Sequence, residues 1–461
     1  MFIIQTVLSS FFIWCFIIAV LGLLRGEKKC PRISQKSETE ALQKNIREAL
    51  QKNNRSVREK NERQFAQEKK FAHASENFVA IHEAAENFAA SNVSSEKFAA
   101  ENLSRFAVVI CAHDEENVIG NLLENLQAQN YPAEKFHVFV LADHCSDGTV
   151  AKAKRFGRVT VWERTGGERS GKGAVLNWGM DRILKKRREF DCVLFFDADN
   201  QIRPDFLLHM NEAFAQGAEI VTGRRLTENP FDSVISQWYT LYWAVVNSLY
   251  NSPRENLGLS AMLSGTGFAF RMELLRDSGW KTYSLSEDIE FTFLENLKGH
   301  RISYLGAATF YDEQPVRLSV MWTQLRRWCT GDFQIAFRYF GDWVKAFFKN
   351  PSWRLWDIFM GVGMTVFFGL TAVSYLAHGG LLIWQGQFPL LAASTLLSYT
   401  ATIAVGFVAA ANSGWPVKKL LPGILTFPIF YSLFSYISLQ SLFFPQKKWV
   451  RIEHKSSRMH F

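Results

Sequence analysis

The sequence has few cysteines, and no two of them have the close spacing of a metal-binding motif or a disulfide framework. Six cysteines are scattered through 461 residues: Cys15, Cys30, Cys111, Cys145, Cys192 and Cys329. Isolated cysteines of this kind give neither a disulfide framework nor a zinc-binding pattern. Their absence of pairing is typical of a protein in a reducing compartment.

Charge is absent from Phe2 to Leu24, a stretch about as long as a bilayer-spanning helix. A signal peptide would begin with positive charge and have a shorter apolar run. Residues 1–25 are therefore predicted to form a transmembrane helix. Three more apolar stretches follow Trp356, namely Ile358 to Leu376, Phe388 to Ala411 and Leu420 to Phe444. About four transmembrane helices are predicted.

The distribution of basic residues predicts which side the soluble part occupies. The first apolar stretch is followed by Arg25, Lys28, Lys29 and Arg32. We therefore expect an integral protein of the cell (plasma) membrane. By the positive-inside rule, its soluble centre is predicted to lie in the cytoplasm. Three later spans would leave the basic tail, residues 445–461, outside, against the same rule. Pro422 and Pro428 make the last span the candidate for a break or a re-entrant course, and the side of the tail stays open.

Glycine is missing between Gly26 and Gly120. Residues 26–104 are rich in Glu, Lys, Ala, Gln and Asn, which predicts a polar, helical insertion. An oligomerisation stalk is the alternative, so an oligomer is allowed. The net charge of +8 sits largely beside apolar segments. Anionic membrane lipids therefore fit it better than nucleic acid does.

The stretch GGERSGKGAV, Gly166 to Val175, lacks one residue of a phosphate-binding P-loop. That motif needs Ser or Thr after its lysine to ligate Mg²⁺, but Gly173 follows Lys172 here. The sequence thus excludes a P-loop nucleotide triphosphatase, and Lys172 needs another explanation.

Between residues 105 and 334, apolar runs such as AVVICA, HVFVLAD and DCVLFFDAD alternate with helical patterns. This alternation predicts a helix-covered parallel sheet, which binds ligands at the carboxyl ends of its strands. Acidic residues fall at several such ends: Asp114, Glu116, Asp143, Asp197 and Asp199.

Three groups of residues could carry chemistry. Asp197 and Asp199 offer hard oxygen ligands for Mg²⁺ or Mn²⁺. Glu287 and Asp288 open a helical run, where they could either stabilise the helix start or supply a general base. The motif QLRRW places its glutamine, second arginine and tryptophan on one helix face, where packing alone could also explain them.

The ordered motifs AHDEEN, ADHCSDGT, SGKGAVLN, DAD, LSGTGFAF, SEDIEF and QLRRW together are specific. From Arg105 to Asp332 the chain resembles family-2 glycosyltransferases of the GT-A fold. It is most similar to membrane-embedded hyaluronan, chitin-oligomer, poly-N-acetylglucosamine and cellulose synthases. The resemblance implies an α/β domain with a Rossmann-like mixed sheet at 105–334. An interfacial helix at 335–356 and a transmembrane region at 357–444 would follow.

The resemblance also implies residue roles. Donor contacts would come from Ala112, His113, Glu116, Asp143, Lys172, Asp197, Gln324 and Arg327. The acceptor would meet Ser264, Gly265, Thr266, Gly267 and Trp328. Asp199, with Asp197, would hold Mg²⁺ or Mn²⁺. Asp288 would be the catalytic base, with Glu287 beside it. Ala142, His144 and Cys145 depart from the family pattern, which puts the finer nucleobase contacts in doubt.

The implied activity is inverting transfer from a UDP-sugar to a growing polysaccharide that is then secreted. Transfer of one sugar to a membrane lipid is the alternative, and a catalytically silent receptor is a third reading. Two aromatic helical stretches, Ile235 to Tyr250 and Ile335 to Phe348, are predicted to lie at the membrane surface, with core helices as the alternative. The pattern does not identify the sugar, the linkage or the product length.

Overall fold

The computed structural model describes residues 2–26, 103–168, 171–276 and 279–446. The predicted insertion at 26–104 and the basic tail at 445–461 lie almost entirely outside the described residues.

An eight-stranded mixed sheet forms the centre of the soluble domain, with the strand order β3-β2-β1-β4-β7-β6-β8-β5. The first four strands in this order are parallel, β7 is antiparallel to β4 and β6, and β6 is parallel to β8. The strands are β1 (Phe106–Ala112), β2 (Phe136–Asp143), β3 (Val159–Arg164), β4 (Cys192–Asp197), β5 (Gln201–Ile202), β6 (Ile220–Thr227), β7 (Phe268–Arg271) and β8 (Ile302–Asp312). This is the α/β mixed sheet that the sequence predicted.

Helices pack against the sheet through apolar faces. One core cluster joins alternate residues of β1, Ala107 and Val109, to Leu176 and Met180 of α6. Period-two alternation in a strand and 3.6-residue periodicity in a helix produce these matching faces. The other helices of the soluble domain are α4 (Ile119–Gln127), α5 (Thr149–Ala153), α6 (Lys172–Lys185), α7 (Phe206–Ala215) and α10 (Glu287–Lys298).

Helix α8 (Val234–Val245) lies between the sheet and the C-terminal helices. It contacts β6 on one side and α14 and α15 on the other, and most of its residues are buried. It continues through a π-helical turn, Val246–Asn251, into α9 (Ser252–Leu257). The segment predicted at Ile235 to Tyr250 is therefore the core helix that the sequence left as its alternative.

Helix α11 (Leu318–Lys349) is one continuous helix. It includes both QLRRW and the stretch predicted to lie at the membrane surface, so the expected boundary at residue 335 falls inside it. In its second half Phe337, Phe340 and Phe348 are exposed. An exposed aromatic face beside membrane helices is typical of an interfacial helix. Helix α12 (Trp353–Val362) follows.

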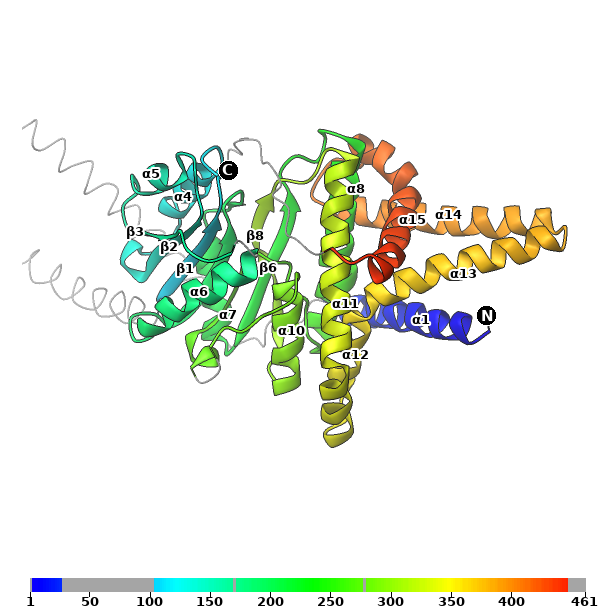
Figure 1. Cartoon of the computed structure of the whole chain (residues 1–461), viewed down its shortest axis with the longest axis horizontal. Coiled ribbons are helices and arrows are strands. Elements are labelled where there is room, and N and C mark those ends of the chain that lie inside the picture. Colours follow the sequence, from blue (N-terminus) through cyan, green and yellow to red (C-terminus); the bar gives the residue numbers. More distant parts are fainter. Residues whose placement is uncertain (1, 27–102, 169–170, 277–278, 447–461) are drawn as a thin grey trace, which may run out of the picture. The chain divides into compact units, whose positions relative to one another are not determined.

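Three described helices are long and apolar enough to cross a membrane: Met364–Trp384, Phe388–Asn412 and Val417–Phe443. They correspond to α13 (Met364–Trp384), α14 (Phe388–Asn412) and α15 (Leu421–Phe443) with its preceding turn. The described part of the N-terminal helix α1 (Phe2–Leu24) is also apolar. Figure 1 shows α1, α13 and α14 extending together away from the sheet.

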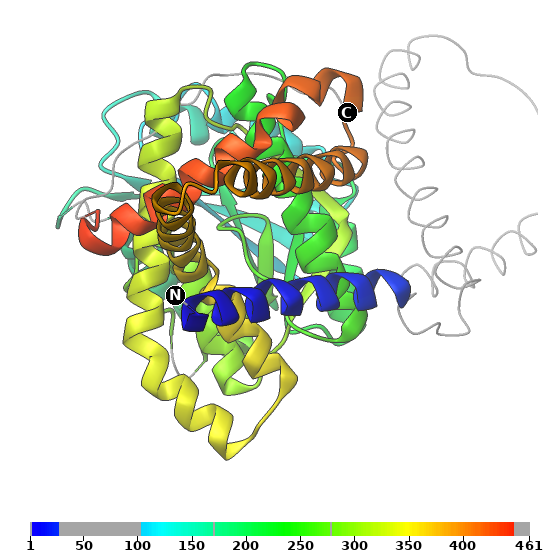
Figure 2. The same ribbon diagram turned by 90° about the vertical axis from the view of Figure 1, so that its right-hand side faces the viewer.

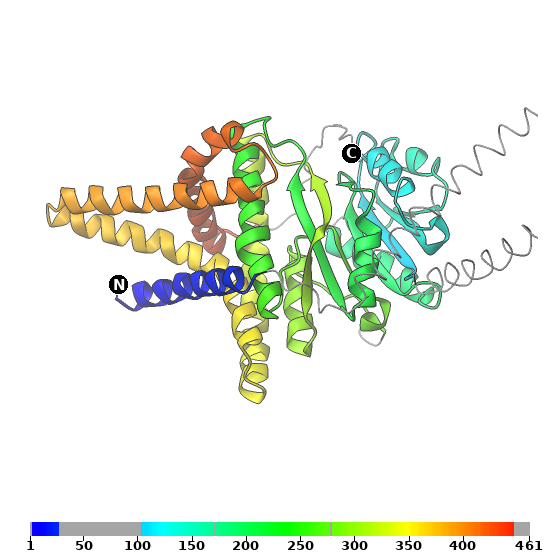
Figure 3. The ribbon, with the colours of Figure 1, turned by 180° about the vertical axis from the view of Figure 1, so that it is seen from behind.

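Helix α15 takes a different course. It continues through Pro428 without a break and crosses the ends of α13 and α14 rather than running beside them (Figures 2 and 3). Half of its most apolar window is buried in the protein, against 6% for α14. Near its end, Gln440 accepts a hydrogen bond from Trp322, and Thr330 accepts one from the Gln446 amide. Residue 446 therefore lies beside α11.

A buried ion pair attaches α1 to the rest of the protein. Arg254 of α9 makes a bidentate pair with Asp357 of α12, at 2.8 and 2.9 Å. Both side chains are 2% exposed. The Trp14 indole of α1 donates to the same carboxylate at 3.0 Å and stacks on Trp353. Three helices from distant parts of the sequence thus meet at one carboxylate.

Replacing Asp357 with asparagine is expected to destabilise the folded protein by about 3–5 kcal/mol, because it leaves the Arg254 charge buried and uncompensated. The thermal unfolding midpoint in detergent measures this. Asp191→Asn is the matched control, since Asp191 makes a similar bidentate pair with Arg105 that is about 40% exposed. An exposed pair contributes about 0–1 kcal/mol. Equal shifts in the two variants would contradict the expectation.

Candidate active site

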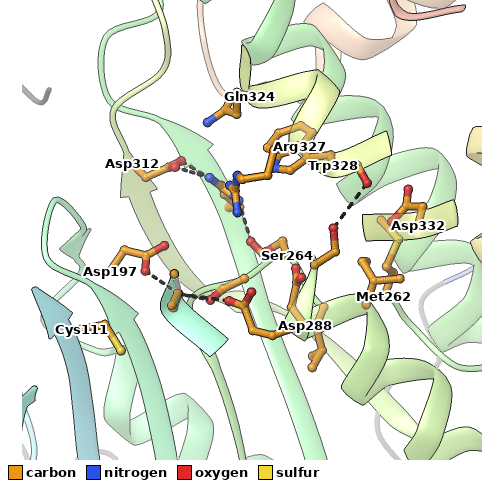
Figure 4. A pocket seen from close by; sticks show the side chains of 18 of the residues that line it. Cys111, Asp197, Met262, Ser264, Asp288, Asp312, Gln324, Arg327, Trp328 and Asp332 are labelled. Carbon is orange, nitrogen blue, oxygen red and sulfur yellow. Dashed lines mark hydrogen bonds and ion pairs between the residues drawn. The ribbon is translucent and has the colours of Figure 1, made fainter. Parts of the chain in front are cut away.

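A cavity of about 250 Å³ opens where strands β1, β2 and β4 end. The start of α10, the loop before β7 and one face of α11 form further parts of its walls. Most of the predicted site residues line it: Ala112, His113, Asp143, Lys172, Asp197, Asp199, Ser264, Gly265, Glu287, Asp288, Gln324, Arg327 and Trp328. Motifs more than two hundred residues apart in the sequence thus share one space (Figure 4).

One end of the cavity is built by the loops that follow β1 and β2. These parallel neighbours pair Ala112 with Ala142, so both loops start at the same edge of the sheet. The His113 ring nitrogen Nδ1 lies 2.6 Å from the Asp143 carbonyl oxygen. The Asp143 carboxylate is held by Arg164 at 2.5 Å and by His144 at 2.8 Å. Fixed polar groups of this kind can orient a planar, hydrogen-bonding ligand.

Lys172 begins α6 and reaches the centre of the cavity. Its Nζ hydrogen bonds to Asp197, donates to the Gly265 carbonyl oxygen at 2.7 Å and lies 4.0 Å from Glu287. Burial alone would lower the lysine pKa, but the carboxylates of Asp197 and Glu287 raise it overall. Lys172 is therefore a fixed positive charge facing the acidic residues.

Asp197 ends β4, and Asp199 follows it. Asn200 and Thr266 accept hydrogen bonds from the Asp197 amide, both at 3.0 Å, which fixes this turn. Burial raises the pKa of Asp312, and the carboxylates of Asp199 and Asp197 make a smaller contribution in the same direction. Three neighbouring carboxylates repel one another unless cations join them, and their hard oxygens fit Mg²⁺ or Mn²⁺. Asp197 and Asp199 are thus suited to hold such an ion.

Glu287 and Asp288 form the first turn of α10 and point into the cavity. Burial, with a smaller contribution from Asp288, raises the pKa of Glu287 to about 7. Burial also raises the pKa of Asp288. A Cβ atom added to Gly265 would lie 3.5 Å from the Asp288 carboxylate, so glycine leaves room beside it. A buried carboxylate with a raised pKa is a suitable general base.

The three QLRRW side chains face the cavity from α11, as the helical spacing predicted. The Arg327 guanidinium donates to the Leu285 carbonyl oxygen at 3.4 Å. The Gln324 oxygen Oε1 is buried without a hydrogen-bond partner among the described residues. Trp328 packs among Tyr239, Tyr242 and Trp243, with ring centroids 5.9–6.2 Å apart. One face of α11 therefore brings an amide, a guanidinium and an indole ring into the same cavity.

Three predicted residues do not line the cavity. The Glu116 carboxylate instead accepts a hydrogen bond from the Gly148 amide at 2.7 Å and joins two loops. Thr266 is buried and hydrogen bonds to Asn200. A Cβ atom on Gly267 would lie 2.1 Å from the Phe310 ring, so this glycine is needed for packing. These three residues stabilise the loops around the cavity through hydrogen bonds and packing rather than by lining it.

The sequence interpretation missed an ion pair in the cavity wall. Arg225 of β6 pairs with Asp312 of β8 and donates to the Ser264 carbonyl oxygen at 2.6 Å. Its guanidinium also lies 4.0 Å from the centre of the Trp243 ring. Asp312 stands at the end of a strand, like Asp143 and Asp197, and that position was the available signal.

A second acidic group lies outside the cavity lining. Asp114, Cys145 and Asp147 bring ligand atoms within 4.8 Å of one another. Asp114 accepts a hydrogen bond from the Ser146 amide at 2.6 Å, and Asp147 accepts from the Thr149 and Glu116 amides. These carboxylates therefore brace the loops after β1 and β2.

Comparison with known families identifies the kind of domain that contains this site. Residues 104–331 match the family described as "Glycosyltransferase like family 2". These residues form a family-2 glycosyltransferase domain. Its mixed sheet, acidic strand ends and deep cavity agree with the GT-A fold that the sequence predicted.

Curated relatives of this glycosyltransferase domain fall into at least two groups. A β-monoglucosyldiacylglycerol synthase of Synechocystis is 26% identical over 326 residues, covering 68% of this chain and 63% of the relative. A poly-β-1,6-N-acetyl-D-glucosamine synthase of Staphylococcus aureus is 26% identical over 244 residues, covering 52% and 57%. The chain thus spans less than two thirds of the length of these relatives.

Among solved structures, the mannosyltransferase PcManGT from Pyrobaculum calidifontis, in complex with GDP-Man and Mn²⁺, is similar to the chain. The TM-score is 0.47 with 18% identity, over 72% of this chain and 87% of that one.

Proposed function

We propose that this protein transfers a sugar, with inversion, from a UDP-sugar to a hydroxyl group of an acceptor at the membrane. The observation that carries this proposal is the single cavity that contains Lys172, Asp197, Asp288 and Trp328. The cavity contains cationic side chains that can bind a diphosphate, a buried carboxylate that can accept a proton, and an aromatic side chain that can pack against a sugar ring.

The reaction follows from this placement. Asp288 removes the proton from the acceptor hydroxyl, whose oxygen attacks C1 of the donor sugar from the face opposite the nucleotide. The bond between C1 and the diphosphate oxygen breaks, and UDP leaves. Lys172 and Arg327 offset the charge that develops on the diphosphate. A Mg²⁺ or Mn²⁺ ion held by Asp199 and Asp197 would supply further charge stabilisation.

We place the donor at the end of the cavity formed by the loops after β1 and β2. In this proposal His113 and Asp143 hold the uracil ring, with Ala112 beside them, and Gln324 contacts the diphosphate. Glu116 contributes by bracing the loop rather than by contact. Ser264 and Gly265 border Asp288 and would meet the acceptor, while Thr266 and Gly267 support that loop.

The course of the membrane helices supports a cytoplasmic catalytic domain in the cell membrane. If α13 leaves the cytoplasmic side and α14 returns to it, α15 can lie along that side against α8 and α11. Residue 446, the last described one, then lies on that side beside α11. Basic residues that follow it in the sequence would agree with the positive-inside rule.

Two acceptors are candidates. Extension of a polysaccharide is favoured by the aromatic cluster around Trp328, because aromatic faces pack against sugar rings. Transfer to a lipid is favoured by the apolar end of the cavity, where α13 and α15 contribute Phe368 and Phe434. The two curated relatives described above carry the names of these two activities.

Mass spectrometry of the products tests the proposal. The protein in lipid nanodiscs would receive Mn²⁺ or Mg²⁺ and a panel of UDP-sugars. A ladder of one repeating sugar mass is expected for a polysaccharide synthase, and a single added sugar on a lipid for the second candidate. If no donor gave either product or released UDP, the proposed function would be overturned.

A further inference from the structure

The cavity extends past the proposed catalytic base into the membrane helices. Beyond Asp288 and Trp328 it is lined by Asp332 of α11, by Gly361 and Val362 of α12, by Met364, Thr365 and Phe368 of α13, and by Phe434 of α15. Figure 4 shows Asp197 on the strand side, Asp332 on the helix side and Asp288 between them. This end of the cavity is largely apolar, and Asp332 is its charged residue.

Asp332 faces the cavity because of its place on α11. It lies four residues after Trp328, so the two side chains project from the same helix face. The Thr365 hydroxyl donates to one carboxylate oxygen, and the Ser438 hydroxyl in turn hydrogen bonds to the Thr365 backbone. Helices α13 and α15 therefore hold this carboxylate in position.

The charge of Asp332 is not balanced by a nearby cation. Within the described ranges, no Lys, Arg or His makes an ion pair with it. Burial, with a smaller contribution from Asp288, raises its pKa to about 7. A partly buried carboxylate without a cationic partner is costly to the fold unless a ligand or water hydrogen bonds to it.

From this geometry we propose that Asp332 binds a second hydroxyl group of the acceptor and thereby determines which hydroxyl reaches Asp288. The inference rests on the proposed function. A carboxylate accepts hydrogen bonds from uncharged hydroxyls, whereas it repels phosphate. The acceptor is accordingly a neutral group with several hydroxyls, carried either by a glycan end or by the sugar headgroup of an uncharged glycolipid.

Kinetics of Asp332→Asn test the assignment. The variant keeps the side-chain shape but removes the charge of the hydrogen-bond acceptor. The KM for the acceptor is expected to rise about tenfold, since hydrogen bonds to charged groups are the stronger ones. The KM for the UDP-sugar and the rate of UDP release without acceptor should stay within about twofold of wild type.

The acceptor panel distinguishes the two sources of the hydroxyl. Chitooligosaccharide represents a glycan end, glucosyldiacylglycerol an uncharged lipid that carries several hydroxyl groups, and phosphatidylglycerol a phosphate-bearing lipid. Wild type should use one of the first two and discriminate against the third. Asp332→Asn should narrow that discrimination, because it removes the repulsion. A wild type that prefers phosphatidylglycerol would overturn the inference.

Two controls separate ligand binding from a structural role. Thr365→Val removes the hydrogen bond between α11 and α13 but keeps the carboxylate. If Thr365→Val reproduces the full effect of Asp332→Asn, the residue only joins helices and the inference fails. Asp342→Asn changes an exposed carboxylate on the same helix and should leave all constants unchanged. Transfer by wild type with unaltered kinetics in Asp332→Asn would refute this inference alone, whereas no transfer by wild type would refute the proposed function.

Discussion

Asp288→Asn is expected to slow sugar transfer by about 10²- to 10⁴-fold, the usual contribution of a positioned general base. An amide cannot take the proton from the acceptor hydroxyl, although it fits the same space at the start of α10. Transfer of radiolabelled sugar measures the loss, and calorimetric titration with the UDP-sugar checks that donor binding survives.

Glu287→Gln is the matched comparison, because Glu287 is the neighbouring buried carboxylate. It lies 4.0 Å from Lys172, and we expect it to hold that lysine rather than to take the proton. A smaller loss is expected from it than from Asp288→Asn. A larger loss would reverse the assignment of the base.

The same carboxylates set the pH dependence. The base acts in its ionised form, so activity is present above its pKa and falls as the pH drops through it. Burial raises the pKa of Asp288 and brings that of Glu287 to about 7. The acid limb of kcat/KM should accordingly lie well above pH 4. The pair titrates jointly, so the limb reports both groups.

Metal removal should have the second large effect. Treatment with a chelator is expected to reduce transfer by on the order of 10²- to 10³-fold, since a metal contributes several kcal/mol of charge stabilisation. Added Mn²⁺ or Mg²⁺ should restore the activity. Asp199→Asn should reproduce the loss and weaken Mn²⁺ binding, which electron paramagnetic resonance measures in the presence of UDP.

Full activity in excess chelator would contradict this expectation. The diphosphate charge would then be offset by Lys172, Arg327 and Arg225 alone. If Asp199→Asn bound Mn²⁺ as well as wild type does, Asp199 would not be a metal ligand, and other residues would have to hold the ion. Asp114, Cys145 and Asp147 would be the next group to examine.

The sequence predicted those features of the fold and the site that depend on a pattern within a single strand or helix. Apolar runs that end in acidic residues predicted the strands and placed Asp143 and Asp197 at one edge of the sheet. Helical spacing placed Gln324, Arg327 and Trp328 on one face of α11. Both inferences depend only on the geometry of a single strand or helix.

Features that depend on pairing between distant segments could not be predicted in this way. Arg225 meets Asp312 because β6 lies beside β8, and no local pattern fixes that neighbour. The composition of α15 is that of a spanning helix, yet its contacts with α8 and α11 turn it across the others. Thr266 and Gly267 match a motif, but their burial is decided by Asn200 and Phe310.

The carboxylate shared by α1, α9 and α12 has a consequence for biosynthesis. Trp14 and Asp357 are 343 residues apart, so at ordinary elongation rates the ribosome needs roughly 17 to 70 s to deliver the second after the first. During that interval Arg254 emerges without its counter-ion, and α1 lacks the contacts that hold it. A nascent chain that stops before residue 353 therefore contains the whole sheet but cannot complete the junction that holds α1.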